Sequence, residues 1–254
     1  MADKHEVNDI ARAFCRLGGT LRLKCVSVDA EAIACKTIKR LAKGEGNSER
    51  PDATITVDGI TIGIEHFKLF PETSRKGDKL EQALSRDRAL FDKAKAKPLL
   101  QVGPIRQYHG EKVTINGMEG RSLDNRSDDA KLKRLLESFR KVYTEHANNI
   151  AEYRKNIDAA SSGKSKLVFL VECANFELLR YRWAANPYYM PGFRNIIRGC
   201  EDTPDYIAFY MYELGHPVTY LIDTSADAQI PCYCTDDASV HIPFCRALKF
   251  RSCE

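Results

Sequence analysis

The stretch of sequence that decides the fold is 51–69, which reads Pro-Asp-Ala-Thr-Ile-Thr-Val-Asp-Gly-Ile-Thr-Ile-Gly-Ile-Glu-His-Phe-Lys-Leu. Two runs rich in isoleucine, valine and threonine flank Asp58-Gly59, a residue pair that tight hairpin turns favour. The pattern predicts a β-hairpin with strands at residues 52–57 and 60–69. A hairpin that turns at these two residues brings Asp52 opposite Glu65, so that both carboxylates face one side of the sheet.

Two carboxylates placed in this way suggest a site for a divalent cation. Neighbouring strands lie about 4.8 Å apart, so the side chains of Asp52 and Glu65 can converge on one ion. Hydrolysis of a phosphodiester uses Mg²⁺ or a similar hard cation, which prefers carboxylate oxygens. A third acid, Glu31, falls on the apolar stripe of a helix predicted to begin at Asp29. Glu31 either joins the cation site or simply favours the positive end of its helix.

The rest of the chain reads as a mixture of helices and strands around this hairpin. Hydrophobic periodicity and chain breakers predict helices at 3–17, 29–43, 77–96, 127–160 and 193–198, and further strands at 21–28, 167–171, 206–212 and 218–222. The helix at 127–160 is too long for one small core, so it either lies across a sheet, bridges two lobes or forms a seam for a homodimer. Its residues Glu145, His146 and Glu152 fall mostly on its polar side, and the helix is interpreted there as scaffold or dimer seam. We expect a core at 1–125, the long bridging or dimerisation helix at 126–162, and C-terminal strands and a helix at 163–254.

Pro51-Asp52, followed thirteen residues later by Glu65 in an Ile-Gly-Ile-Glu strand, resembles the PD-(D/E)XK nuclease superfamily over residues 29–97. The resemblance implies a restriction-endonuclease-like α/β fold, with a mixed sheet flanked by helices. It also implies a metal-dependent DNA endonuclease that acts in restriction, defence or mobile-element processing. Asp52 and Glu65 would then hold Mg²⁺ or Mn²⁺, with Glu31 as the accessory acid on the first helix. A second Pro-Asp pair, Pro204-Asp205, shows that the dipeptide alone is not specific.

The sequence departs from the superfamily pattern at one position. Phe67 stands two residues after Glu65, where the superfamily has a lysine that orients the attacking water, and Lys68 points to the opposite strand face. Lys79 or Gln82, on the helix predicted at 77–96, is the expected replacement. Candidate DNA contacts are Lys68, Lys76, Arg86 and Lys93. The alternative is a catalytically inactive protein that keeps the fold and binds nucleic acid or another protein without cutting.

Composition sets outer limits on these interpretations. The chain has 254 residues, 43% of them hydrophobic, which is enough for a real core and excludes disorder for most of its length. The net charge of +4 is far from that of a histone-like protein, so contacts to DNA must come from local clusters. The charged N-terminal residues and the lack of a long apolar run lead us to expect a cytoplasmic protein without membrane contact.

The C-terminal region contains a set of residues with zinc-ligand chemistry. Cys232, Cys234, His241 and Cys245 supply the soft and borderline ligands of a tetrahedral zinc site. The single residue between the first two cysteines is shorter than the spacing that zinc knuckles use, which favours buried cysteines in a sheet. A zinc-stabilised adaptor is the third functional hypothesis that the sequence leaves open.

Overall fold

The computed structural model describes residues 6–24, 26–46, 48–69, 112–115, 118–121, 128–173, 191–213, 216–225 and 246–250. The chain divides into two compact units, one made of Met1–Pro71 and Leu135–Glu254 and the other of Glu72–Arg134. The described strands of the second unit are β4 (Lys112–Ile115) and β5 (Met118–Arg121), which pair in antiparallel fashion. The sheet and the candidate site belong to the first unit.

Seven of the described strands form one mixed sheet in the first unit, in the order β2-β3-β6-β7-β8-β1-β9. The strands are β1 (Thr20–Lys24), β2 (Ala53–Val57), β3 (Ile60–Leu69), β6 (Lys164–Cys173), β7 (Tyr206–Glu213), β8 (His216–Asp223) and β9 (Arg246–Lys249). The pairs β3–β6, β6–β7 and β1–β8 are parallel, and the other neighbours are antiparallel. The prediction of a mixed α/β sheet is confirmed at this level.

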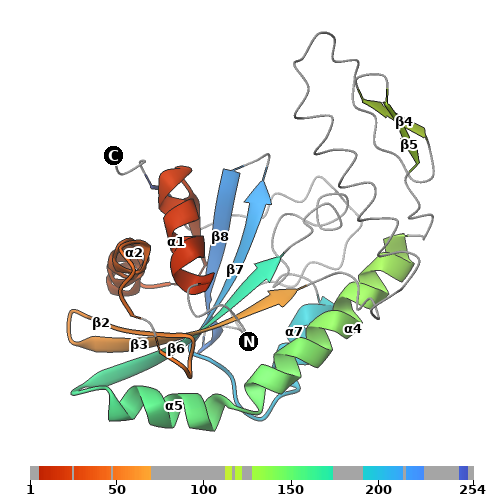
Figure 1. Ribbon diagram of the computed structural model, residues 1–254. Coiled ribbons are helices and arrows are strands. Elements are labelled where there is room, and N and C mark those ends of the chain that lie inside the picture. The colour runs from red at the N-terminus through yellow and green to blue at the C-terminus, as the bar shows by residue number, and fades with distance from the viewer. Residues whose placement is uncertain are drawn as a thin grey trace. The chain divides into compact units, whose positions relative to one another are not determined.

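Helices cover both faces of the sheet (Figure 1). On one face, α1 (Glu6–Arg16) and α2 (Val28–Ala42) pack over the isoleucine side of the β2–β3 hairpin. The other face is covered by α5 (Ile150–Ala159), α7 (Pro191–Arg198) and the part of α4 (Asp128–Ala147) that lies in the first unit. Within the described residues, no helix combines the length and the apolar character that crossing a bilayer requires.

The hairpin at the edge of the sheet forms as its sequence predicts, with strands at Ala53–Val57 and Ile60–Leu69. Asp58 and Gly59 both have positive φ, at 50° and 77°, which the tightest hairpin turns require of their two central residues. The register pairs Ala53 with Ile64. One step beyond this pair, Asp52 and Glu65 therefore face each other on the side of the sheet that α5 covers.

The region predicted as one helix at 127–160 is two helices, so the prediction of a continuous helix was wrong. α4 ends at Ala147 and α5 begins at Ile150. At the break, the Asn149 side chain donates a hydrogen bond to the carbonyl of Glu145 at 3.0 Å. An asparagine side chain that bonds to the backbone competes with the helical pattern, and two consecutive asparagines, 148 and 149, make a stop favourable.

The apolar residues of these two helices lie against the sheet of their own chain. The buried side chains are Leu135, Phe139, Tyr143, Ile150, Tyr153 and Ile157. Phe139 contacts Phe193 of α7 and Phe209 of β7, with ring centroids 4.6 Å and 6.4 Å away. From Leu135 to Ala159 the region therefore lies across the sheet of the first unit, and its roles as a bridge between two lobes and as a homodimer seam stay predictions.

Gly63 lets α5 approach β3 closely. A Cβ atom at Gly63 would lie 2.5 Å from Cγ1 of Ile157 and 2.8 Å from Cγ of Pro51. Ile157 is only 1% exposed, so its side chain has little room to move away. Tyr153 lies one helical turn before Ile157, and Glu65 lies two residues after Gly63. The close approach of α5 to β3 therefore also sets how far Tyr153 lies from Glu65.

We expect Gly63→Ala to lower the free energy of unfolding by about 1–3 kcal/mol, because the new methyl group overpacks the α5–β3 contact. Ile157→Ala removes the two closest atoms that the methyl group would meet and leaves Cγ of Pro51. In a double-mutant cycle followed by urea denaturation, the cost of Gly63→Ala should therefore be smaller in the Ile157→Ala background. Additive costs would show that the close approach does not limit this position.

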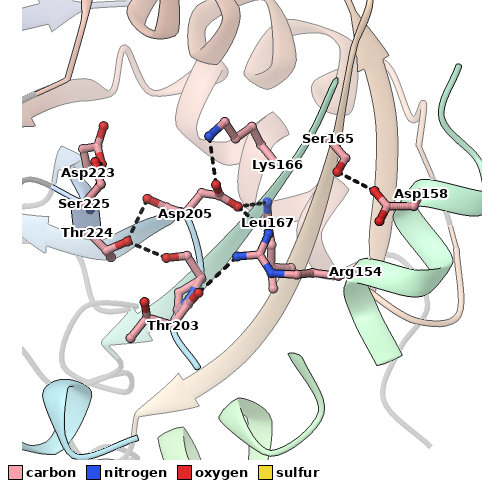
Figure 2. Close-up of polar contacts among 11 residues, drawn as sticks. Arg154, Asp158, Ser165, Lys166, Leu167, Thr203, Asp205, Asp223, Thr224 and Ser225 are labelled. Atoms are coloured by element: carbon pink, nitrogen blue, oxygen red, sulfur yellow. Dashed lines mark hydrogen bonds and ion pairs between the residues drawn. The ribbon is translucent and has the colours of Figure 1, made fainter. Parts of the chain in front are cut away.

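The second Pro-Asp pair ties three elements of the first unit together (Figure 2). Oδ2 of Asp205 accepts hydrogen bonds from the backbone N–H of Leu167 and from Nη1 of Arg154, both at 2.9 Å. Oδ1 accepts from Nζ of Lys166 at 2.8 Å. Burial alone would raise the pKa of Asp205, but the hydrogen bonds from Lys166 and Leu167 and the charge of Arg154 outweigh burial and lower it. Asp205 therefore holds α5, β6 and the start of β7 in place as an ionised group.

Asp205→Asn should destabilise the protein by about 1–3 kcal/mol at pH 7, since it leaves two cations without their shared carboxylate. The lowered pKa means that the stabilisation is fully present above the unfolded pKa of about 3.9 and is lost as pH falls through the folded pKa. The gap between wild type and variant should thus shrink in urea denaturations below about pH 4. Exposed Asp202 provides the matched control, and Asp202→Asn should cost less than about 0.5 kcal/mol.

Candidate functional site

Asp52 and Glu65 lie on one face of the sheet, at the open end of the β2–β3 hairpin. Oδ2 of Asp52 accepts a hydrogen bond of 2.7 Å from the backbone N–H of His66, which fixes the carboxylate beside β3. Glu65 is buried, with 7% of its surface exposed. The two carboxylates interact electrostatically, because the charge of Glu65 contributes to the shifted pKa of Asp52. The structure therefore brings together the two acids on which the expected cation site depends.

Two helices supply hydrogen bonds to the buried Glu65. Oε1 of Glu65 accepts from the hydroxyl of Tyr153 and from Nδ1 of His146, both at 2.8 Å. His146 stands in the last turn of α4 and Tyr153 in the first turn of α5, so the two donors reach one oxygen from either side of the break between the helices. Burial and the Glu65 carboxylate raise the pKa of Tyr153, which remains a neutral donor.

Phe67 stands two residues after Glu65 and so lies on the same face of β3. Its ring is 5% exposed and stacks on the imidazole of His146, with centroids 4.6 Å apart and planes inclined by 17°. It also makes edge contacts with Phe169 and Tyr143, at 5.7 Å and 6.5 Å between centroids. Phe67 therefore belongs to the core and fixes the plane of the His146 ring.

The two Pro-Asp pairs differ in their electrostatic surroundings. Burial raises the pKa of Asp52, and the charge of Glu65 raises it further, while the hydrogen bond from His66 N–H offsets only part of this. Among the described residues Asp52 forms no ion pair, whereas Asp205 has two cationic partners. Carboxylates whose charge is left uncompensated in this way are typical of functional sites.

Two neighbouring carboxylates are the kind of donor groups that a hard divalent cation prefers. Within the described part of the chain, Oδ1 of Asp52 and Oε2 of Glu65 make no hydrogen bond, so each acid keeps one oxygen for an ion. The described residues contain no group of three or more His, Cys, Asp or Glu side chains arranged around a metal position. Mg²⁺ usually binds through one or two carboxylates and completes its shell with waters and substrate phosphates, so a pair of acids is sufficient.

The opposite face of β3 has a second polar cluster, which contains Lys68. Nε2 of His66 lies 3.1 Å from Oε2 of Glu172, and Nδ1 lies 3.3 Å from Oε2 of Glu6. Nζ of Lys68 pairs with Glu6 and stands 3.9 Å from Glu172. The hydrogen bond to His66 lowers the pKa of Glu172. This cluster connects α1 to β3 and β6 and is separated by the sheet from Asp52 and Glu65.

Glu31 is not brought to the carboxylate pair by its helix. It stands on α2, whose apolar side packs on the face of the sheet that carries Ile55, Ile62 and Ile64. Asp52 and Glu65 point to the other face. The remaining predicted residues lie outside the described residues: Lys76, Lys79, Gln82, Arg86, Lys93, Cys232, Cys234, His241 and Cys245.

Sequence reasoning missed His146 and Tyr153 as neighbours of Glu65. The interpretation of His146 as scaffold on a polar helix face assumed that the helix continues, and the break at Asn149 removes that assumption. The consecutive asparagines were the signal that could have found it.

Comparison with known proteins adds no relative. No protein-family model, curated protein or solved structure matches the chain. The function must therefore be argued from the site itself.

We expect Asp52→Asn to leave the free energy of unfolding at pH 7 equal to or above that of wild type. The amide oxygen of asparagine can still accept the His66 N–H, and the variant no longer holds a charge that burial disfavours. Because the pKa of Asp52 is raised, wild type gains stability as the carboxylate takes up its proton, so the difference should vanish as pH falls below the unfolded pKa of about 3.9. Urea denaturation at several pH values measures this. A clear loss of stability at pH 7 would mean that ionised Asp52 has a stabilising partner.

Proposed function

We propose that this protein is a metal-dependent nuclease that hydrolyses DNA phosphodiester bonds. The observation that carries the proposal is the pair Asp52 and Glu65, which stand opposite each other on one sheet face with an oxygen free on each. The chain topology also supports the proposal. A helical crossover connects β3 to the parallel strand β6, which agrees with the mixed sheet flanked by helices that the resemblance implies. Restriction, defence or mobile-element processing is the biological role that the resemblance of residues 29–97 to the PD-(D/E)XK superfamily suggests.

The residues of this chain divide the work as follows. Asp52 and Glu65 hold Mg²⁺ or Mn²⁺, which when bound lowers the pKa of water and offsets the charge that develops on the phosphate. The His66 N–H orients Asp52, and Tyr153 orients Glu65. Lys79 or Gln82 is proposed to orient the water, and Lys76, Arg86 and Lys93 to contact the DNA. Lys68 and Glu31 have less support, because Lys68 is ion-paired on the other sheet face and the helix of Glu31 covers that face.

A second candidate function is binding of nucleic acid without cleavage. The observation that favours it is Phe67, which replaces the lysine with a buried aromatic ring. A protein of this kind would keep the fold and the DNA contacts but lack the group that orients the water.

The test is incubation of supercoiled plasmid with the full chain and Mn²⁺, beside Asp52→Asn and Glu65→Gln. Both substitutions keep an acceptor for the hydrogen bond of the wild-type side chain, so the fold should persist, which circular dichroism checks. We expect cleavage by wild type and a loss of at least about 100-fold in each variant, because each removes a charge that binds the cation. Asp202→Asn is the matched control and should cleave like wild type.

Cleavage that persists in both variants would refute the assignment of the site. No cleavage by wild type, together with a gel shift of the same DNA, would instead establish the second candidate function. If neither cleavage nor a gel shift is observed, both candidate functions are excluded.

A further inference from the structure

Arg50 places a positive charge against the helix that covers the carboxylate pair. Its backbone carbonyl accepts a hydrogen bond from Nδ2 of Asn156 at 3.0 Å, and Nη1 of its guanidinium lies 3.1 Å from Oε2 of Glu152. Asn156 and Glu152 both belong to α5 and stand about one helical turn apart. Arg50 is therefore attached to α5 both at its main chain and at the end of its side chain.

The first of these contacts fixes where the Arg50 main chain lies along β3. Asn156 is next to Ile157, whose side chain packs against Gly63 of β3. The Arg50 carbonyl therefore lies against the turn of α5 that covers Gly63. Only Pro51 separates Arg50 from Asp52 in the sequence.

The second contact brings the guanidinium to the level of the carboxylates. Glu152 stands in the first turn of α5, next to Tyr153, whose hydroxyl donates to Glu65. The Arg50 side chain thus follows α5 from the turn over Gly63 to the turn that contacts Glu65. Its charge ends at the same turn of α5 as the donor to the carboxylate pair.

The guanidinium is open to a ligand. The Arg50 and Glu152 side chains are 60% and 49% exposed, and exposed ion pairs of this kind contribute little to stability. Among the described residues, Glu152 is the one side-chain partner of Arg50 and contacts one nitrogen, so most of its five N–H donors are free. Arg154 differs, because it bonds to Asp205 and to the carbonyl of Thr203.

The carboxylate pair creates a need for such a cation. Asp52 and Glu65 repel the phosphates of an approaching DNA strand, and a net charge of +4 over 254 residues does not offset this locally. A guanidinium is planar and can bind two oxygens of one phosphate at once. A cation beside the pair can therefore hold the DNA backbone while the carboxylates hold the divalent ion.

We propose that Arg50 binds a phosphate of the DNA backbone next to the one that is cleaved, an inference that rests on the proposed nuclease function. Without DNA, Glu152 holds the guanidinium against the first turn of α5. When DNA binds, the phosphate takes the place of the Glu152 carboxylate. Arg50 is thus a substrate-binding residue, and Glu152 is its competitor for the DNA.

The test measures binding of a short DNA duplex to the full chain by fluorescence anisotropy, with Ca²⁺ in place of Mn²⁺ and a gel to check that the DNA stays intact. Arg50→Gln should weaken binding about tenfold, because it removes charge-assisted hydrogen bonds to a phosphate. It should also reduce the slope of log affinity against log salt by about 0.9, the value for one lost phosphate contact. Glu152→Gln should instead tighten binding about twofold to fivefold, because it removes the competitor.

The matched controls are Arg12→Gln and Asp9→Asn. Arg12 and Asp9 also form an exposed ion pair, with side chains 51% and 60% exposed, but they stand on α1, which covers the other face of the sheet. Each control changes the net charge by the same amount as its counterpart at the site. Both controls should bind DNA with the affinity and the salt slope of wild type.

The outcomes separate this inference from the proposed function. If wild type cleaves plasmid and Arg50→Gln binds and cleaves like Arg12→Gln, the phosphate contact is overturned and the nuclease stands. If wild type binds DNA without cleaving it, and Arg50→Gln alone weakens binding and lowers the slope, the contact stands and the nuclease falls. If Glu152→Gln weakens binding as much as Arg50→Gln, the ion pair supports the local structure and Arg50 is not a phosphate ligand. If wild type does not bind DNA, both proposals fall.

Discussion

The burial of one carboxylate, that of Glu65, is the constraint on which the arrangement of the site depends. The register of the hairpin turns this side chain to the covered face of the sheet, where an acid without partners would be very unfavourable. Tyr153 and His146 meet this requirement from two different helices. Both donors reach one oxygen because α5 lies close over Gly63 and because the helical region breaks before Ile150. The break between α4 and α5, Gly63 and the two donors therefore act together to stabilise one buried carboxylate.

The hairpin and the opposition of Asp52 and Glu65 could be predicted from the sequence because they depend only on local rules: a turn that demands positive φ, and strand alternation. The division into α4 and α5 was harder, since hydrophobic periodicity runs through the asparagines and only backbone competition at Asn149 stops the helix. The contact of His146 with Glu65 could not be predicted from the sequence, because it depends on the angle between the helices at that break.

The same limit applies to the two Pro-Asp pairs. Their sequences are alike, but partners distant in the sequence, Arg154 and Lys166, make Asp205 a structural ion.

The two faces of β3 show how one strand can serve two purposes. Glu65 and His66 are consecutive, yet the first bonds to α4 and α5 while the second contacts Glu6 of α1 and Glu172 of β6. The backbone N–H between them holds Asp52. A single peptide unit thus connects the helices on both sides of the sheet to the carboxylate pair.

The aromatic environment of Phe67 limits which side chains position 67 can accept. The ring is enclosed by Phe169, Tyr143 and the imidazole of His146, so the space at this position suits a planar aromatic group. A lysine at position 67 would also remove the stacking that orients His146. Position 67 is therefore coupled to its neighbours: a side chain other than a planar ring of this size would loosen the imidazole that contacts Glu65.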